Sequence, residues 1–526
     1  MMSQPGDSFF RTLFLKSDVM IYGLVLFICI ILAAWFPITN DESYYIAYAG
    51  SPELSYIDAP PFVSYLNLIQ ARFGLTSPIS VRAWVMVLHL FSTLFLMHIV
   101  YRHCSQDETV SRRLLLTFLM AYLVPIFGLF GLFVLPDTGL ILSLSIMLWA
   151  ADDVFCTQQV RWSHVWVLGL GFGIGLLSKY HILPLGAGML LGLWVDLTLR
   201  SSHPWRSLYR LVLSGIMGLV CALPVILWNV ENHYASIVFQ LQHGFASDHW
   251  QVKTFILFLL GAMVYVTPWF GYVLLKRGLF FKPCWHLLIP VGSLMLILLF
   301  SSLRKSVLPH WISPAFWCLI PSTVIFSSEL KSLLKLCIYT SLIWVLLLGA
   351  LLLPGGLMTI KTWSMVVKPD PRMFKDLLLW QELPDLLHQN LRVHHALEAQ
   401  FLQKQSPACT HSKPIIGTLR WFWASQMEYH QMFPGATILN LDQNSSNFYL
   451  WRDTWSDFAN CRLVVLGGES SGVLTALGNI MTIEHEEVIH GLGDYVSMNV
   501  QLVEGTLRDA ATLQKAQKSL IDHPHY

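Results

Sequence analysis

The chain carries a series of long apolar segments separated by short clusters of charged residues. A helix of about 20 apolar residues is long enough to cross a bilayer. The sequence therefore predicts a polytopic α-helical membrane protein in which residues 1–354 form the transmembrane domain. About eleven spans are expected, near residues 19–37, 83–101, 114–136, 138–151, 163–178, 180–195, 211–229, 254–275, 283–303, 311–328 and 336–354.

Composition supports a membrane protein and gives no support to a nucleic-acid-binding protein. Hydrophobic residues make up 55% of the chain and charged residues only 12%, whereas a soluble chain averages about 25% charged residues. The net charge of +1 gives no electrostatic reason to expect nucleic-acid binding. Several tryptophans stand near the predicted span ends, as expected for an interfacial aromatic belt. They are Trp35, Trp162, Trp228, Trp250 and Trp311.

The distribution of Lys and Arg predicts the orientation. These residues are more frequent in the loops that would share a side with the N-terminus, and such loops face the cytoplasm. With an odd number of spans, residues 355–526 then lie outside. Before residue 355 the outer loops keep six basic residues, which are Arg72, Arg82, Lys179, Lys253, Arg304 and Lys305.

Residues 355–526 have ordinary charge density and no span, and they predict a small extracytoplasmic α/β domain. Strands are expected at 436–442, 461–468 and 495–505, and helices at 371–389 and 470–481. Cys409 and Cys461 are the two cysteines of this domain, and they are expected to pair if the compartment is oxidising.

Two motifs of this domain resemble ligand sites but lack the required spacing. The segment LVVLGGESSG is a strand, a glycine turn and a helix without the G-x-G-x-x-G spacing, so nucleotide binding is disfavoured. His485 and His490 are five residues apart and do not form H-E-x-x-H, which disfavours a zinc site.

The first outer loop, Thr39 to Arg82, is long, acidic and aromatic. It contains Asp41 and Glu42 side by side, and Asp58 just before Pro60-Pro61. A carboxylate held at a polar–apolar boundary can serve as a general base or a metal ligand. The alternative is structural, because Thr39-x-x-Glu42 fits a capping box that starts a helix near Asn40.

A second helix is predicted after Pro60-Pro61. Phe62, Tyr65, Leu66, Ile69 and Phe73 recur on one helical face. A helix that is amphipathic and too short to span a bilayer is expected to lie in the membrane interface. Packing of this face on the outer domain is the alternative.

Four of the outer basic residues stand at span ends and suggest an anion site. A cation beside hydrocarbon is costly unless it has an anionic partner, and a lipid phosphate is the anion at that depth. Snorkelling to ordinary headgroups is the alternative. These residues are Arg82, Lys179, Arg304 and Lys305.

Asp137, in LPDTG, lies at the outer junction of two predicted spans, where an ionisable residue is a functional candidate. A Pro-Asp turn would explain it equally. His310 in VLPHW could bind metal, as could the histidines at 233, 243 and 249, although plain loop histidines are the more common case. Together these features predict a cavity at the outer headgroup level that is lined by carboxylates and cations.

The spaced motifs of this region resemble those of membrane glycosyltransferases with the GT-C fold. The similar family contains the protein O-mannosyltransferases and the lipid A aminoarabinose transferases of bacteria. The motifs occur in order and on one membrane face, between about residues 20 and 330. They are DESYY, YIDAPPFVSYL, LPDTGLIL, GLLSKYHILPL, PVILWNVENHYASIVFQLQHG and PHWISPAFW.

The resemblance implies a reaction and roles for the residues. The chain would transfer a sugar from a polyprenyl-phosphate donor, with inversion, to a lipid, glycan or protein acceptor at the outer face of a bacterial inner membrane. Asp41 would be the general base, with Glu42 beside it, and Asp137 would orient a substrate or help hold a divalent metal. The donor phosphate would be met by Arg82, Lys179, Arg304 and Lys305, with Tyr45, Asp58 and His310 as further donor contacts.

Two positions depart from the family pattern. Tyr45 stands where aminoarabinose transferases have Arg, and Ala59 stands where they have Lys. The sugar and the acceptor therefore stay open. Two other hypotheses are a transporter or lipid-carrier flippase, and a non-catalytic member of the family that scaffolds an envelope complex.

Overall fold

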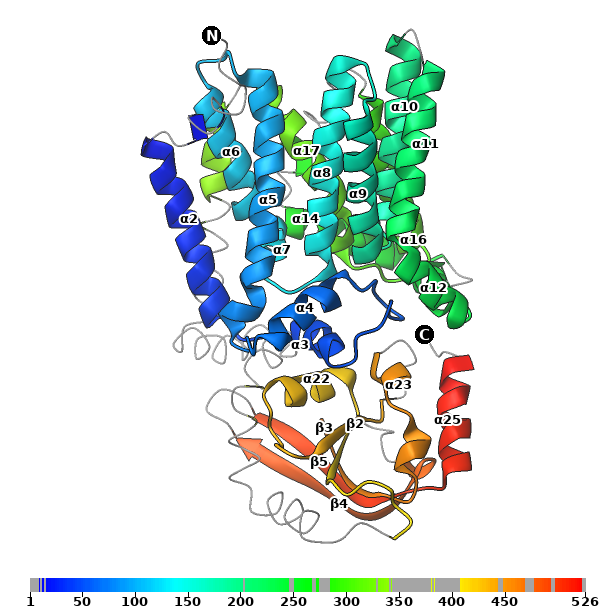
Figure 1. Cartoon of the computed structure of the whole chain (residues 1–526). Coiled ribbons are helices and arrows are strands. Elements are labelled where there is room, and N and C mark those ends of the chain that lie inside the picture. The colour runs from blue at the N-terminus through cyan, green and yellow to red at the C-terminus, as the bar shows by residue number, and fades with distance from the viewer. Residues whose placement is uncertain are drawn as a thin grey trace. The chain divides into compact units, whose positions relative to one another are not determined.

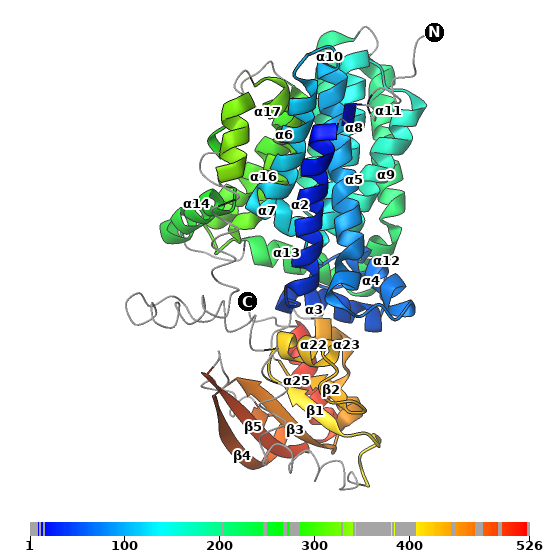
Figure 2. The same ribbon diagram turned by 90° about the vertical axis from the view of Figure 1, so that its left-hand side faces the viewer.

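The structure is a computed structural model of the chain (Figures 1 and 2). It describes residues 16–201, 204–245, 250–266, 271–273, 284–327, 330–339, 407–442, 448–468, 477–492 and 497–522, together with residues 9, 12, 13, 342, 380 and 383. The chain forms two compact units. The helical unit comprises Met1–Phe36 and Leu54–Leu348, and the C-terminal unit comprises Pro37–Glu53 and Gly349–Tyr526.

The described part of the helical unit is built almost entirely from helices. Its elements are α2 (Lys16–Trp35), α4 (Phe62–Arg72), α5 (Pro78–Cys104), α6 (Val110–Leu123), α7 (Pro125–Phe130), α8 (Pro136–Thr157), α9 (Trp162–Ser178), η2 (Leu183–Ala187), α10 (Gly188–Arg200), α11 (Pro204–Cys221), α12 (Leu223–Glu231), α13 (Ala235–Phe245), α14 (Val252–Val266), α16 (Trp285–Ser302), η3 (Pro309–Ile312) and α17 (Ser313–Ile325).

Within the described residues, five helices are long and apolar enough to cross a membrane, or six if α11 and α12 form one span bent by 56°. Other expected spans are shorter or interrupted. The segment predicted at 114–136 is divided into α6 and α7 before Pro125, because proline cannot donate to the helix and restricts the residue before it. The expected span at 336–354 lies mostly outside the described residues.

α8 is the centre of the helical unit. Most of its residues are buried, and it packs against α5, α9 and α17; the three helices α5, α8 and α9 stand side by side in Figure 1. Glycines on α9 allow a similarly close approach of α11. A Cβ at Gly173 would lie 2.4 Å from the Cβ of Cys221, so a larger residue would push the two helices apart.

The described part of the C-terminal unit is a five-stranded sheet with helices packed on both faces. The strand order is β2-β1-β3-β5-β4; β1 pairs in parallel with β2 and β3, and β5 is antiparallel to β3 and β4. The strands are β1 (Ile415–Thr418), β2 (Thr437–Asn440), β3 (Arg462–Gly468), β4 (Met481–Leu492) and β5 (Ser497–Leu507). The helices are α3 (Asn40–Ala47), η1 (Tyr48–Gly50), α22 (Trp421–Tyr429), α23 (Phe448–Arg452), η4 (Trp455–Phe458) and α25 (Ala510–Asp522).

Alternation along β3 divides the core of this unit into two clusters. Val464 and Leu466 pack with Trp423 and Met427 of α22, whereas the residues between and beside them face Leu513 of α25. Successive side chains of a strand point to opposite faces, so a helix covers each face of the sheet. The α/β character predicted for this region is confirmed.

The three predicted strands are present as β2, β3 and β5. β1 and β4 were not expected, and β4 contains the His485–His490 segment. Its charged residues conceal the strand pattern, which is common for a strand at the edge of a sheet. The helix predicted at 371–389 lies outside the described residues apart from Trp380 and Leu383, and the one predicted at 470–481 lies mostly outside them.

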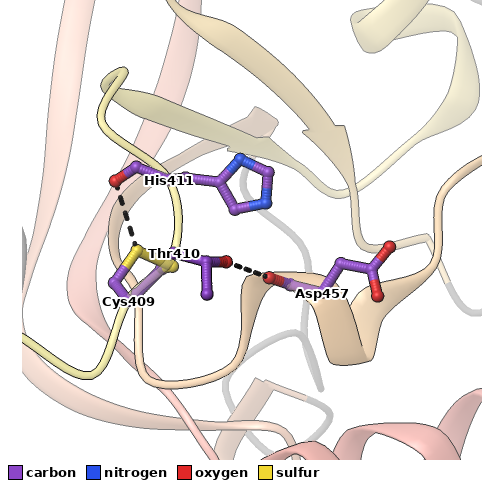
Figure 3. The surroundings of a disulfide bond; sticks show 5 residues. Cys409, Thr410, His411 and Asp457 are labelled. Atoms are coloured by element: carbon purple, nitrogen blue, oxygen red, sulfur yellow. Dashed lines mark hydrogen bonds between the residues drawn. A yellow bond between two sulfur atoms is a disulfide. The ribbon is translucent and has the colours of Figure 1, made fainter.

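The expected disulfide joins Cys409 and Cys461, with 4.7 Å between their Cα atoms (Figure 3). Cys409 precedes β1 and Cys461 precedes the parallel neighbour β3, so both lie at the same end of the sheet. Close by, the ring of His411 stacks on Phe458 with their centroids 4.2 Å apart, and Thr410 donates to the carbonyl of Asp457.

The grouping of residues 37–53 was not expected. The sequence divides the chain into residues 1–354 and 355–526, whereas in the structure the first part of the outer loop belongs to the C-terminal unit. The cause is a set of polar and aromatic contacts made by α3, which are described with the site below.

Candidate functional site

An ion pair between Asp137 and Lys179 is the centre of the candidate site. The ammonium nitrogen of Lys179 lies 2.9 Å from Oδ1 and 2.8 Å from Oδ2 of Asp137. The Lys179 side chain is 18% exposed and that of Asp137 only 5%. The pair therefore holds the ammonium group in a position that is mostly shielded from solvent.

Both residues are placed by helix ends. α8 begins with an extended Leu135 and Pro136 in its first turn, so Asp137 lies at the helix N-terminus, where the helix dipole favours a carboxylate. Lys179 is the C-cap of α9 and has extended backbone angles. α8 and α9 pack side by side, which brings these two ends together.

Two histidines flank the pair. His181 and His310 both interact electrostatically with Asp137 and with Lys179. The ring of His181 packs edge-on against Trp311, at 5.2 Å between centroids, and His310 packs against Tyr265 at 5.8 Å. The loop after α9 and the short helix η3 thus bring aromatic rings to the pair.

Burial, and then the charge of Lys179, lowers the pKa of His181 to about 3 and that of His310 to about 4. Both rings are therefore neutral at physiological pH. They can donate or accept a hydrogen bond, but they add no positive charge, so Lys179 is the charged member of this cluster that can meet an anion.

Tyr180 extends the site in another direction. Its hydroxyl lies 2.6 Å from Oγ of Ser236, and Ser236 donates to Oδ1 of Asn229 at 2.8 Å. Burial raises the pKa of Tyr180, and the charge of Asp58 acts in the same direction. Asp58 is tied to the same region, since its carbonyl accepts from Nε2 of Gln240 at 3.0 Å.

α4 lies against the start of α8. A Cβ at Gly139 would be 2.3 Å from Oγ of Ser178 and 2.6 Å from Cδ1 of Phe62, so the glycine makes room for both neighbours. The first residue of α4 therefore packs against α8 two residues after Asp137.

The buried face of α4 is mostly polar, with Ser64, Asn67 and Gln70 beside Val63, and large apolar side chains are exposed on the opposite side. Ser64 bonds to the hydroxyl of Tyr56 at 2.6 Å, and Asn67 accepts from the indole nitrogen of Trp84 at 3.2 Å. On the other side Ile69 is 55% exposed and Phe73 is 76% exposed. A surface helix of a soluble protein has the opposite arrangement, so this geometry supports the predicted interfacial helix.

Arg82 is fully buried and is engaged at the end of α2. Its guanidinium donates to the carbonyls of Ala33 at 2.9 Å and Phe36 at 2.7 Å, and it lies 5.2 Å from the centroid of the Phe133 ring. These contacts satisfy carbonyls that the helix end leaves without intrahelical partners. The structure thus gives Arg82 a capping role.

Arg304 follows α16 and lies over two aromatic rings. Its guanidinium carbon is 4.8 Å from the centroid of Trp250 and 5.7 Å from that of Phe300. Lys305 is next to it and half-buried. The structure brings together Asp137, Lys179 and His310 of the predicted residues, and it places Arg82 and Arg304 in other contacts.

The first-loop carboxylates lie on α3 in the C-terminal unit. The capping box is present: the Thr39 amide donates to Oε2 of Glu42 at 3.0 Å, and the Glu42 amide donates to Oγ1 of Thr39 at 3.3 Å. Glu42 is fully buried, whereas Asp41 is exposed. The structural interpretation of Glu42 is therefore confirmed, and a role for Asp41 as a base stays a prediction.

α3 is fixed by α22 and by an aromatic cluster. Ser43 bonds to Ser425 at 2.8 Å, and Nε2 of Gln426 donates to Oδ1 of Asn40 at 3.1 Å. The hydroxyl of Tyr44 accepts from the amide of Phe448 at 2.6 Å. The rings that surround Tyr44 within this unit are Tyr45, Tyr48, Trp421, Phe448 and Tyr449.

The geometry does not favour a divalent metal on Asp137, because both of its carboxylate oxygens contact the Lys179 ammonium. Sequence reasoning missed the contacts of Tyr180, His181, Asn229 and Ser236 near the ion pair. Their motifs, SKYH and WNVENHYAS, were recognised, but no spacing rule shows that a hydroxyl in one bonds to a hydroxyl in the other across 56 residues.

Comparisons with known proteins agree with this fold. Residues 58–228, which include α4, α8 and the ion pair, match the model of the family described as "Dolichyl-phosphate-mannose-protein mannosyltransferase". No curated protein matches the chain significantly in sequence.

Two solved structures are similar over nearly the whole chain. ArnT from Cupriavidus metallidurans in the apo state is 15% identical, with a TM-score of 0.57 over 95% of this chain and 98% of that one. The same protein bound to undecaprenyl phosphate is 16% identical, with a TM-score of 0.57 over 92% and 97% of the two chains. ArnT is a GT-C lipid A aminoarabinose transferase, so the expected GT-C fold is confirmed.

Proposed function

Since the chain has the GT-C fold, we propose that it is an inverting membrane glycosyltransferase that uses a polyprenyl-phosphate-linked sugar. One observation carries the proposal: the Asp137–Lys179 ion pair, with a buried carboxylate and a partly buried ammonium, lies at the start of α8, where Phe62 of α4 packs at Gly139, within the segment that matches the mannosyltransferase family. The undecaprenyl phosphate bound by the similar ArnT structure supports a lipid-phosphate donor.

Lys179 stabilises the leaving group in this proposal. As the bond between the anomeric carbon and the phosphate oxygen breaks, the electron pair stays on the phosphate, whose charge increases. A preorganised cation that meets such developing charge is usually a large source of catalysis. Asp137 holds the ammonium in place before the donor arrives, and the neutral rings of His181 and His310 can supply hydrogen bonds to the phosphate or sugar.

Asp41 is the proposed general base. The acceptor hydroxyl gives its proton to this carboxylate while its oxygen forms the new bond to the anomeric carbon from the side opposite the phosphate. A positioned base contributes roughly 10²–10⁴-fold to the rate. Its exposure and its place in the first turn of the rigidly capped α3 support this role.

The apolar side of α4 is proposed to contact the lipid chains of the donor. Its exposed Ile69 and Phe73 would lie among acyl or prenyl chains, while its polar side holds the helix to the protein. Arg304, Lys305, Tyr45, Asp58 and His310 stay proposed donor contacts. For Arg82 the capping contacts support a structural role.

The proposed location is the bacterial inner membrane, with the C-terminal unit in the periplasm. The Cys409–Cys461 disulfide supports an oxidising compartment for this unit. The acceptor is proposed to be a hydroxyl of an envelope glycolipid, glycan or protein. Tyr45 and Ala59 argue against assuming the substrates of an aminoarabinose transferase.

The test is a transfer assay on membranes with a radiolabelled polyprenyl-phosphate sugar. Wild type should release free polyprenyl phosphate and move the label to an acceptor, whereas Lys179→Gln should lose at least 10²-fold in rate. Lys253→Gln is the matched control, because Lys253 is an exposed lysine at the start of α14. Full transfer by Lys179→Gln would contradict the proposal, and movement of intact donor across the membrane without cleavage would favour a flippase.

A further inference from the structure

The end of α8 opposite Asp137 carries a second group of chemically reactive side chains. Asp152 and Cys156 are four residues apart and share a face of α8, and His103 lies in the last turn of α5 beside them. Fifteen residues of helix separate Asp152 from Asp137, which corresponds to about 22 Å. This group is therefore distinct from the candidate active site.

We propose that His103, Asp152 and Cys156 form a site for a divalent transition metal, with Zn²⁺ as the preferred ion. Nε2 of His103, a carboxylate oxygen of Asp152 and Sγ of Cys156 all lie within 4.8 Å of one another. Among the residues that the structure describes, this is the only group of three or more His, Cys, Asp or Glu side chains with such convergence.

The two distances from His103 are close to those of a metal site. Nε2 of His103 is 2.7 Å from Oδ1 of Asp152 and 3.7 Å from Sγ of Cys156. A tetrahedral Zn²⁺ with ordinary bond lengths holds N, O and S ligands about 3.3–3.8 Å apart. Replacement of the proton between His103 and Asp152 by the metal requires their separation to grow by only about 0.6 Å.

The orientation of the groups favours a metal over a nucleophilic cysteine. In a Cys–His–Asp relay the thiol and the carboxylate use opposite nitrogens of the imidazole. Here the thiol and the carboxylate both approach the same nitrogen, Nε2. Three ligand atoms that converge on one region are the arrangement needed for chelation.

A supporting residue orients the carboxylate. Arg102 contacts Oδ2 of Asp152 at 2.5 Å and leaves Oδ1 for His103. Its guanidinium also lies 5.7 Å from the ring centroid of Trp149, which keeps the side chain in place. Such outer partners commonly fix metal ligands. Asp153, which neighbours Arg102 at 3.8 Å, is bonded instead to His164 at 2.7 Å.

Charge and access fit the ion as well. The thiolate of Cys156 and the carboxylate of Asp152 together balance a divalent charge, and a mixed S, N and O ligand set suits Zn²⁺ rather than Mg²⁺ or Ca²⁺. Cys156 and His103 are exposed, while Asp152 is buried. Water can therefore complete the coordination.

The test uses the full-length protein in detergent, first freed of metal and then titrated with Zn²⁺ or with Co²⁺ as a spectroscopic probe. We expect one Zn²⁺ per chain, a thiolate-to-cobalt charge-transfer band, and loss of this band in Cys156→Ser. His103→Gln should bind Zn²⁺ at least tenfold more weakly, and Arg102→Gln about 10–100-fold more weakly. Cys221→Ser, which removes another free thiol from the helical unit, is the matched control and should bind as wild type.

A second measurement, the alkylation rate of Cys156 in the wild-type protein, tests the proposal even if some variants fold poorly. In wild type, Zn²⁺ should slow the alkylation of Cys156, measured by peptide mass spectrometry, and His103→Gln should remove this protection. A wild-type protein without the cobalt band, or equal Zn²⁺ affinity in Cys156→Ser, would overturn the proposal. Zn²⁺ bound elsewhere, with no protection of Cys156, would have the same consequence.

Discussion

The ammonium of Lys179 contacts both carboxylate oxygens of Asp137, at 2.9 and 2.8 Å, although the two residues are 42 positions apart. Each residue of the pair therefore stabilises the other. A carboxylate with 5% of its side chain exposed is costly without its cation, and the cation is held in one place by the carboxylate.

This pair predicts non-additive effects. Lys179→Met should lower the free energy of unfolding by roughly 3–5 kcal/mol, because the buried carboxylate loses its partner. The double variant with Asp137→Asn should be more stable than the sum of the two single changes implies. Thermal melts in detergent measure both, with Lys253→Met as the control. Strictly additive effects would show that the pair does not interact.

Arg82 predicts a structural phenotype. Arg82→Gln should destabilise the protein by about 1.5–3 kcal/mol for each charged hydrogen bond lost to the carbonyls of Ala33 and Phe36. The exposed Arg72 at the end of α4 offers the control Arg72→Gln, which should melt as wild type. A stable Arg82→Gln with a much higher KM for the lipid donor would instead favour direct phosphate binding.

The two histidines of the site predict a pH dependence. Their pKa values of about 3 for His181 and about 4 for His310 lie below the ordinary 6.5 of the unfolded chain. The unfolded state therefore binds more protons as the pH falls, so their contribution to stability is full above about pH 6.5 and is lost toward pH 4 and below. The melting temperature of wild type should fall between pH 7 and 4.5 by more than that of the double variant His181→Gln, His310→Gln.

The partners that face these rings are Lys179 and Asp137, and the two histidines also face each other. If the double variant lost as much stability as wild type over this range, the histidines would not be the titrating groups. Donor binding should show no step near pH 6.5, because neither ring gains a charge there.

The disulfide predicts how many cysteines react with a thiol label before and after reduction. The denatured, non-reduced protein should react with a thiol label at seven cysteines, and at nine after reduction. Cys461→Ser should lower the stability of the C-terminal unit by about 4 kcal/mol, since the bridge closes a loop of 52 residues. Cys221→Ser should leave that stability unchanged. Labelling of all nine cysteines before reduction would show that the bridge does not form.

The two faces of α4 predict opposite phenotypes. Ile69→Asp places a charge on the exposed apolar face, so it should raise the KM for the lipid donor several-fold with little change in the melting temperature. Asn67→Ala removes the acceptor for Trp84 on the buried face and should lower the melting temperature by an amount that corresponds to about 1–3 kcal/mol. The reverse pattern would mean that the apolar face packs on protein.

Sequence patterns that depend on near neighbours predicted the structure well. The capping box of Thr39 and Glu42, the helix after Pro60-Pro61 and the strand at 461–468 each follow from residues a few positions apart. The apolar face of α4 was also visible, but its orientation was not, because it depends on polar partners such as Tyr56 and Trp84.

Local sequence patterns did not predict the contacts between segments that are distant in the chain. A basic residue at a span end has the same local signature at Arg82 as at Lys179, yet one caps a helix and the other pairs with a carboxylate. The difference arises from which helix end lies alongside, and only the packing of α2, α5, α8 and α9 determines that. The sequence did not predict the group of His103, Asp152 and Cys156 for the same reason, because its members lie on α5 and α8 and are about fifty residues apart in the chain.

The association of α3 with α22 has a consequence for recombination between relatives. The C-terminal unit is encoded by two separate stretches, residues 37–53 and 349–526, which interlock through Asn40, Ser43 and Tyr44. In a chimera that takes only residues 349–526 from a relative, the native α3 would have to pack against a foreign α22. Exchange between homologues should therefore succeed only when both stretches come from the same parent, and natural variants should inherit them as one module.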